Sequence, residues 1–350
     1  MKSFLLYGSY GYTGQLIIAR ALKEGLRPIL AGRDENKLRA QANQYSLEYR
    51  AFSLNETDKL DSASREVDAV LHCAGPFVHT FRQMAEACLR TKKHYVDISG
   101  EIPGFEGVAA MDAQAKEAGI MLMPGGGFDI VPSDCLAAHV RQRLPLATHL
   151  RLFLSGVGAG FSRGTAKSAI ENMHRQGRIR RDGKLTQVQP AWKVLTQDFG
   201  KGPVKVVSVG WGDVSSAYYS TGIPNIEVYF ALPRALINFL YDMRVLGPLL
   251  YNRPVKNLLK AMIDLLPPGP SEERRKNKFA TLIGEATDQD GGRAASKLHV
   301  PEGYTCTALT TVEIMKRILN NEYKVGFQTP SLAYGKDFIL QFDGVKREDL

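Results

Sequence analysis

The first fourteen residues constrain the fold of this chain more than any other segment. Residues 4–7 form a short apolar run typical of a buried strand, and helical periodicity begins at about residue 13. Three glycines spaced GxxGxxG connect this strand to the helix. Glycine is required where a chain turns tightly or where phosphate approaches its backbone amides. The order strand, glycine-rich loop, helix predicts a pyrophosphate site at the helix N-terminus, and the alternative is a glycine turn without a ligand. The expected cofactor contacts in this loop are Gly8, Tyr10, Gly11, Tyr12, Thr13 and Gly14.

The strand–helix rhythm continues beyond this loop. Further apolar runs lie at residues 28–31, 49–52, 69–72, 95–98 and 120–123, with polar helical stretches between them. Continuous apolar strands that alternate with helices predict a parallel sheet covered on both faces. The fold class is therefore α/β, with a doubly wound Rossmann domain expected over residues 1–131.

Residues 132–350 show a different pattern, which predicts a second α+β domain for substrate binding or dimerisation. Helices are expected at 165–176, over most of 234–266 and at 302–319, and a loop at 156–164. Strands suited to an antiparallel sheet are expected at 204–209, 216–220, 226–230, 278–285, 292–299 and 338–342.

The end of the second strand indicates which dinucleotide binds. NAD sites usually place an acidic residue here to hold the ribose 2′-hydroxyl. This chain has Gly32 and Arg33, so we expect the small glycine to leave room for a 2′-phosphate and the guanidinium to bind it. Asp34 is interpreted as a helix N-cap. NADP is therefore the predicted cofactor, and a solvated loop arginine is the alternative.

Polar and glycine-rich residues follow three later strands, where ligands of doubly wound sheets bind. The expected cofactor contacts after the fourth strand are Ala74, Gly75 and Pro76. His72, Asp97 and Asp129 lie at the ends of the fourth, fifth and sixth strands and are the candidate proton donors. A purely structural role is the alternative for each of the three.

The composition indicates which partners, metal sites and cellular locations to expect. Forty-five basic minus 36 acidic residues give a net charge of +9 over 350 residues, without a compact basic run or a nucleic-acid-binding motif. No nucleic-acid partner is expected. Four separated cysteines without metal-ligand spacing argue against a disulfide framework and a metal site, and favour a reducing, cytoplasmic location. The N-terminus lacks the pattern of a signal peptide.

Five ordered segments together resemble the saccharopine dehydrogenase-like oxidoreductases. They are GSYGYTGQL from Gly8, LAGRDENKL from Leu30, VLHCAGPF from Val70, HYVDISGE from His94 and GGFDIVPSD from Gly126. The resemblance implies an NADP-binding Rossmann domain with Gly8, Gly11, Gly14 and Arg33 as cofactor contacts. It extends to trans-acting enoyl reductases, and it implies that residues from about 302 to 350 pack back on the Rossmann domain.

The predicted function is NADP-dependent hydride transfer to or from a C=C, C=O or C=N bond of a small or acyl substrate. No tyrosine has a lysine four positions later, so the short-chain dehydrogenase pair is absent and the proton donor lies elsewhere. Arg163, Arg175 and Arg178 are candidates for binding an acidic or CoA-like substrate, and a solvated basic face is the alternative. The alternative is a non-catalytic NADP sensor.

Residues 235–266 combine many leucines with interspersed Lys and Arg. This pattern suits an interfacial helix at a membrane, but it favours a helical hairpin that covers the second domain or forms a dimer contact. A homodimer is expected, and the membrane or lipid-associated role is kept as an alternative.

Overall fold

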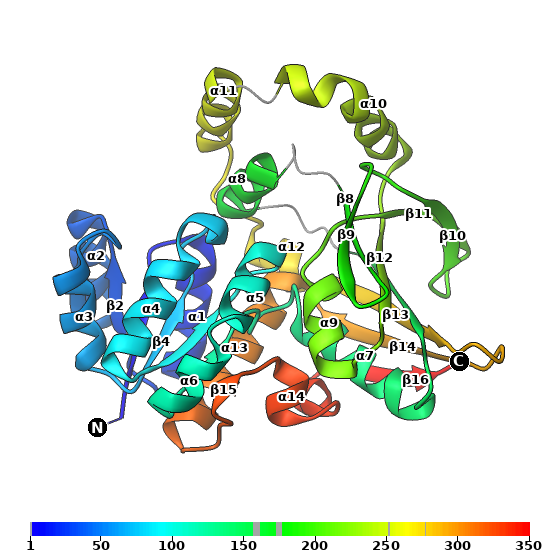
Figure 1. The fold of residues 1–350 in the computed structure, drawn as a ribbon. Helices are drawn as coiled ribbons and strands as arrows, with labels where there is room; N and C mark the ends of the chain where they lie inside the picture. The colour runs from blue at the N-terminus through cyan, green and yellow to red at the C-terminus, as the bar shows by residue number, and fades with distance from the viewer. Residues whose placement is uncertain (1, 157–161, 173–176, 251–252, 277) are drawn as a thin grey trace. The chain divides into compact units, whose positions relative to one another are not determined.

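The computed structural model describes residues 2–156, 162–172, 177–250, 253–276 and 278–350 (Figure 1). The chain forms two compact units. The first comprises residues 1–131 and 304–333, and the second comprises residues 132–303 and 334–350. The family resemblance implies that roughly 302–350 packs on the Rossmann domain, whereas in the structure residues 334–350 belong to the second unit.

The first unit is built on a parallel sheet of seven strands within the described residues, in the order β15-β6-β5-β4-β1-β2-β3. These strands are β1 (Phe4–Tyr7), β2 (Ile29–Gly32), β3 (Tyr49–Ala51), β4 (Ala69–His72), β5 (His94–Asp97), β6 (Met121–Met123) and β15 (Gly326–Phe327). The helices are α1 (Tyr12–Lys23), α2 (Glu35–Tyr45), α3 (Thr57–Arg65), α4 (Phe81–Thr91), α5 (Ile102–Ala109), α6 (Asp112–Ala118) and α13 (Gly303–Leu319), with the 3₁₀ turn η1 (Phe77–His79). The predicted doubly wound α/β fold is confirmed.

The core of this unit follows from its apolar strands. All four residues of β1 and of β4 are buried, so both faces of the sheet are covered. Helix α1 turns Gly14, Ile17, Ile18 and Ala21 inward at helical spacing. This packing fixes the carboxyl ends of β1, β2, β4 and β5 along one edge, which is where a doubly wound sheet binds its ligand.

The second unit contains a mixed sheet of nine strands within the described residues, with the path β10-β11-β12-β7-β13-β14-β16 and with β8 and β9 beside β12. These strands are β7 (His149–Ser155), β8 (Gly177–Arg181), β9 (Lys184–Val188), β10 (Val194–Asp198), β11 (Pro203–Ser208), β12 (Asn225–Ala231), β13 (Phe279–Thr287), β14 (Arg293–Pro301) and β16 (Lys346–Asp349). Most pairs are antiparallel, as expected, but β12 and β7 are parallel. The helices are α7 (Val131–Arg143), α8 (Arg163–Asn172), α9 (Asp213–Thr221), α10 (Arg234–Leu250), α11 (Arg253–Asp264), α12 (Glu272–Lys276) and α14 (Pro330–Tyr334), which spans the boundary between the units.

Two strand predictions in this unit are wrong. Residues 216–220 belong to α9, which starts after the N-cap Gly212 and ends at Gly222 in the left-handed region. The expected strand at 338–342 is the 3₁₀ turn η2 (Phe338–Gln341), and the last strand is β16. Part of the loop expected at 156–164 and the end of the helix expected at 165–176 lie outside the described residues.

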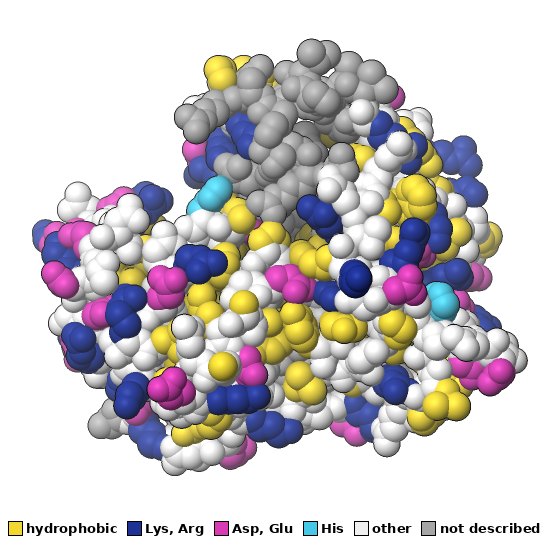
Figure 2. Space-filling view, in the orientation of Figure 1, with side chains coloured by type: hydrophobic (Ala, Val, Ile, Leu, Met, Phe, Trp, Pro, Cys, Tyr) yellow, Lys and Arg dark blue, Asp and Glu magenta, His cyan; other side chains and the backbone are white. Residues whose placement is uncertain are grey.

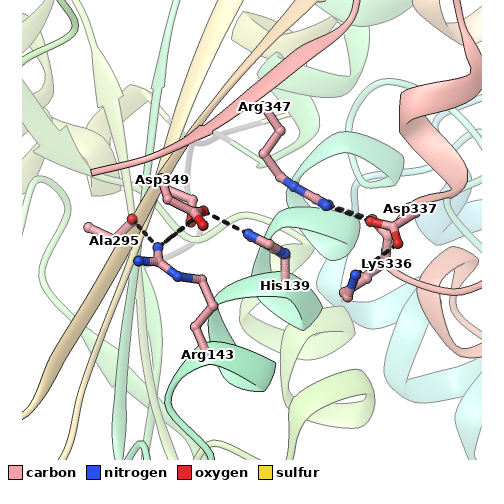
Figure 3. Close-up of polar contacts among 8 residues, drawn as sticks. His139, Arg143, Ala295, Lys336, Asp337, Arg347 and Asp349 are labelled. Atoms are coloured by element: carbon pink, nitrogen blue, oxygen red, sulfur yellow. Dashed lines mark hydrogen bonds and ion pairs between the residues drawn. The ribbon is translucent and has the colours of Figure 1, made fainter.

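Polar contacts attach β16 to its unit (Figure 3). The Asp349 carboxylate accepts hydrogen bonds from Ser296 Oγ and His139 Nε2, each at 2.8 Å, and forms an ion pair with Arg143 at 3.2 Å. At the other end of the strand, Arg347 forms an ion pair with Asp337. The strand is therefore held by side chains from α7 and β14 as well as by its backbone ladder.

The surface carries charged side chains of both signs, interspersed with apolar ones over the face shown in Figure 2. The exposed apolar side chains of α11 are Leu258 at 63% and Met262 at 56%, followed by Leu265 at 85%. In the part of the chain that the structure describes, no helix has the length and apolarity needed to cross a bilayer.

Candidate cofactor and active site

The glycine-rich loop is shaped by two positions that admit no side chain. Gly8 has φ +87°, and a Cβ there would lie 2.9 Å from the backbone nitrogen of Ala74. A Cβ at Gly14 would lie 2.5 Å from the Ser9 carbonyl oxygen. Gly11 is the N-cap of α1 and offers no side-chain cap, so the N-terminus of this helix keeps the positive end of its dipole for a ligand.

Tyr12 and Thr13 form the first turn of α1. The Tyr12 ring lies edge-on against the Tyr304 ring of α13, with 4.9 Å between centroids. The predicted contact residues therefore surround one helix N-terminus, which is the geometry that binds a pyrophosphate.

The end of β2 differs from the expectation in one respect. Gly32 was expected to leave room for a 2′-phosphate, but the Tyr10 ring fills that space, 2.6 Å from where a Cβ at Gly32 would lie. Arg33 is exposed beside it. Asp34 caps α2 as expected, and its carboxylate accepts a hydrogen bond from the Lys37 amide at 3.1 Å. The absence of a side chain at Gly32 therefore makes room for the Tyr10 ring, and Arg33 remains exposed at the edge of the sheet.

The loop after β4 runs beside the glycine loop. Ala74 contacts Gly8, as the close approach of its backbone nitrogen shows, and the Gly75–Pro76 peptide bond is cis. The Glu101 carboxylate accepts hydrogen bonds from the backbone amides of Phe77 at 3.1 Å and Val78 at 2.8 Å. Glu101 therefore holds this loop in place, a role that the sequence reasoning did not assign to it.

His72 is fully buried at the end of β4. Its ring lies between those of Tyr7 and Phe77, and its Nε2 is 2.9 Å from Thr80 Oγ1. Burial lowers the pKa of His72 to about 3, so the imidazole is neutral at physiological pH. An uncharged, enclosed ring of this kind is poorly suited to deliver a proton to a ligand.

Asp97 is also fully buried, at the end of β5. Its Oδ1 accepts hydrogen bonds from the amides of Ser99 at 2.8 Å and Gly125 at 2.9 Å, and its Oδ2 accepts one from the Tyr95 hydroxyl at 2.5 Å. Burial raises the pKa of Asp97, and these hydrogen bonds oppose the rise. The carboxylate thus ties the end of β5 to the turn after β6.

Asp129 lies in the turn after β6 and is half-buried. A Cβ at Gly100 would lie 3.1 Å from its Oδ2, so the carboxyl group rests against the loop that follows β5. Burial, and secondly the negative charge of Glu101, raise the pKa of Asp129 to about 7. A carboxyl group with this pKa is matched to proton transfer at neutral pH.

Helix α13 fixes the turn that carries Asp129. Thr307 Oγ1 accepts a hydrogen bond from the Phe128 amide at 3.0 Å, and Thr310 Oγ1 donates to the Gly126 carbonyl at 2.8 Å. Sequence reasoning missed both threonines, because they follow the turn by about 180 residues and belong to no local motif.

Among the described residues, two of the three arginines expected to bind substrate have different hydrogen-bond partners. Arg163 Nε donates to the Leu266 carbonyl at 2.6 Å, whereas Arg178 lies on β8 beside Gln187. Arg175 lies outside the described residues. A cavity of about 290 Å³ in the second unit is lined by His149, Leu150, Arg151, Ile179, Arg180, Arg181, Lys193, Asn225 and Glu227. This lining carries more positive than negative charge and suits an anionic group.

The fold and the glycine-rich loop define a dinucleotide-binding Rossmann protein. Comparison with protein families agrees, since residues 4–123 match the saccharopine dehydrogenase NADP binding domain. Residues 4–123 are therefore similar to an NADP-binding domain, which agrees with the predicted cofactor. The resemblance that the sequence motifs indicate is confirmed.

Curated relatives are similar to part of the chain. A lipid droplet localized protein of Caenorhabditis elegans is 24% identical over 185 residues, covering 47% of this chain and 43% of the relative. A probable mitochondrial saccharopine dehydrogenase-like oxidoreductase of Arabidopsis thaliana is 26% identical, covering 37% and 32%. A trans-acting enoyl reductase of Mycobacterium leprae is 29% identical, covering 40% and 35%. The match with this chain spans less than half the length of each relative.

Among solved structures, apo saccharopine dehydrogenase (L-Glu forming) from Saccharomyces cerevisiae has a TM-score of 0.67 and 14% identity, with full coverage of both chains. This likeness extends the shared fold to both units.

Proposed function

We propose that the protein is an NADP-dependent oxidoreductase that transfers hydride to or from a C=C, C=O or C=N bond of a small or acyl substrate. The NADP-binding domain family supports the cofactor and the reaction class. When bound, NADPH would supply the hydride or NADP⁺ would accept it, and this chain must orient the substrate and exchange a proton.

Asp129 is the proposed proton donor, and its raised pKa is the observation that carries this assignment. A carboxyl group with a pKa of about 7 is partly protonated at neutral pH, so it can both give and take a proton. Asp97 is proposed as a positioning residue and His72 as part of the core, because their contacts are internal. Gly8, Gly11 and Gly14 would admit the pyrophosphate, and Ala74, Gly75 and Pro76 would border the rest of the dinucleotide.

The test measures NADPH oxidation against a panel of carbonyl, enoyl and imine substrates, including acyl-CoA thioesters. With any active substrate, Asp129→Asn is expected to lower kcat by about 10²- to 10⁴-fold, the usual contribution of a general acid, while the Kd for NADPH changes little. Asp343→Asn, at an exposed position, is the matched control. Unchanged turnover in Asp129→Asn would remove the assignment, and NADPH binding without oxidation of any substrate would favour the sensor alternative.

A second candidate role is peripheral contact with a lipid surface. The exposed side chains of Leu258 and Met262 on α11, and of Leu265 just after it, favour it, as does the name of the lipid droplet relative. The protein should then float with anionic liposomes, and replacing these three residues with serine should abolish flotation. If the wild-type protein does not float, or if the serine variant instead changes the oligomeric state in light scattering, the lipid role is wrong.

A further inference from the structure

The Tyr10 hydroxyl occupies a defined hydrogen-bonding position at the carboxyl end of β2. Its oxygen accepts from the backbone amide of Arg33 at 3.2 Å and from that of Asp34 at 3.3 Å. With both amides directed at the oxygen, the hydroxyl proton must point away from the strand. Among the residues that the structure describes, none accepts this proton at hydrogen-bonding distance. Tyr10 therefore presents a donor to whatever ligand lies at this edge.

The tyrosine is held in place by packing. Its ring covers Gly32 so closely that any side chain there would collide with it. The backbone carbonyl of Tyr10 accepts a hydrogen bond from Gln15 Nε2 at 3.2 Å, which fixes the loop on the side of α1. A ring fixed at both ends is pre-organised, so its hydroxyl donates without a large entropic cost.

The surroundings of this hydroxyl are cationic. Arg33 is exposed next to it, and Lys37 Nζ lies 5.6 Å from the centre of the Tyr10 ring. The neighbouring carboxylate is already engaged, because Asp34 accepts from the Lys37 amide and forms an ion pair with Lys37 Nζ at 3.1 Å. These contacts lower the pKa of Asp34. Asp34 is thus a poor partner for a ribose diol. An anion at this edge would instead meet the neutral Tyr10 hydroxyl and the cations Arg33 and Lys37.

We propose that Tyr10 and Lys37 are specificity residues for the 2′-phosphate of NADP and act together with Arg33. The inference rests on the proposed cofactor site; it gives the expected contact Tyr10 a specific role there and adds Lys37. The Tyr10 hydroxyl, polarised by the two amides behind it, donates to a phosphate oxygen, and Lys37 adds positive charge. The 2′-hydroxyl of NAD is neutral and gains less from this arrangement, because hydrogen bonds to charged groups are roughly twice as strong.

The test uses two adenosine probes that differ only in the group at issue. Adenosine 2′,5′-bisphosphate and AMP are titrated by calorimetry into the full chain and into Tyr10→Phe, with Tyr49→Phe as the matched control on β3. Tyr10→Phe should weaken bisphosphate binding about tenfold and leave AMP binding within about twofold, the loss expected for one hydrogen bond to a charged acceptor. Lys37→Gln should weaken the bisphosphate by about threefold, with less effect at high salt.

Other results would overturn the proposal in distinguishable ways. Equal weakening of both probes in Tyr10→Phe would mean that Tyr10 only shapes the loop. Tighter bisphosphate binding in this variant would mean that the phenol blocks the phosphate position. In both cases the wild-type protein still prefers the bisphosphate, so the cofactor assignment stands. If the wild-type protein shows no preference for the bisphosphate over AMP, the cofactor site fails together with the inference.

Discussion

Asp129 and Asp97 follow neighbouring strands, yet the two carboxyl groups have different surroundings. Asp97 is fully buried and accepts three hydrogen bonds, so its charge is balanced by donors. Asp129 lies near the negative charge of Glu101, which adds to the effect of burial on its pKa. Burial and this nearby charge bring the pKa of Asp129 to about 7, where a carboxyl group can carry a proton at neutral pH.

The pH dependence of turnover follows from this difference. Reduction of a substrate by NADPH needs Asp129 protonated, so kcat should fall as pH rises through about 7. Oxidation needs the carboxylate, so in that direction kcat should rise over the same interval. Measuring kcat in both directions between about pH 5 and about pH 9 tests this dependence.

Asp129→Asn is the control for this pH dependence and should lose it in both directions. A wild-type profile without an ionisation near pH 7 would contradict the assignment.

The sequence alone locates the glycines and the candidate carboxyls, because both belong to local motifs at strand ends. It does not locate Glu101 as the acceptor for the Phe77 and Val78 amides, because that contact joins two loops after different strands. The sequence also does not predict that the Tyr10 ring covers Gly32, because the two residues are separated in the chain by α1.

At the scale of secondary-structure elements, β16 offers a direct test of how a terminal strand is attached. The hydrogen bond from His139, followed by that from Ser296, lowers the pKa of Asp349 (Figure 3). A lowered pKa means that the ionised carboxylate stabilises the fold above its unfolded pKa of about 4. This stabilisation is lost as pH falls through the lower, folded pKa.

Asp349→Asn should therefore lower the Tm at pH 7 by about 2–4 °C, the shift expected for a small loss in a unit of this size. The difference from wild type should shrink as the pH is lowered below about 4. Thermal melts followed by circular dichroism measure both, with Asp343→Asn on the preceding loop as control. A difference that stays constant with pH would show that the charge of Asp349 contributes nothing.

The two wrong strand predictions have identifiable causes. Residues 216–220 include two tyrosines, which are common in strands, but the buried residues Val214, Ala217 and Thr221 recur at spacings of three and four. Residues 338–342 are apolar enough for a strand, yet the hydrogen bond from the Leu340 amide to the Asp337 carbonyl closes a 3₁₀ turn. Short apolar segments do not distinguish these conformations, because tertiary contacts decide between them.

At the scale of the whole molecule, the two units differ in how much their sequence reveals. In the first unit, each strand from β1 to β6 is joined to the next by one or two helices, so local periodicity predicts these steps. Its last strand, β15, pairs with β6 from about 200 residues further along the chain. The parallel pairing of β12 with β7 is similarly non-local. Periodicity carries no information on such pairings, and only the resemblance to a known family indicated that a late segment returns.

The central claim is that the loop from Gly8 to Gly14 binds the pyrophosphate of NADP. Its most direct test is titration calorimetry of the folded full chain with NADPH, beside Gly14→Val, whose larger side chain would meet the Ser9 carbonyl. Circular dichroism would establish that both proteins are folded. We predict saturable binding by the wild-type chain and a loss of at least about tenfold in affinity in the variant. Absence of binding by the folded wild-type protein, or equal affinity in Gly14→Val, would contradict the claim.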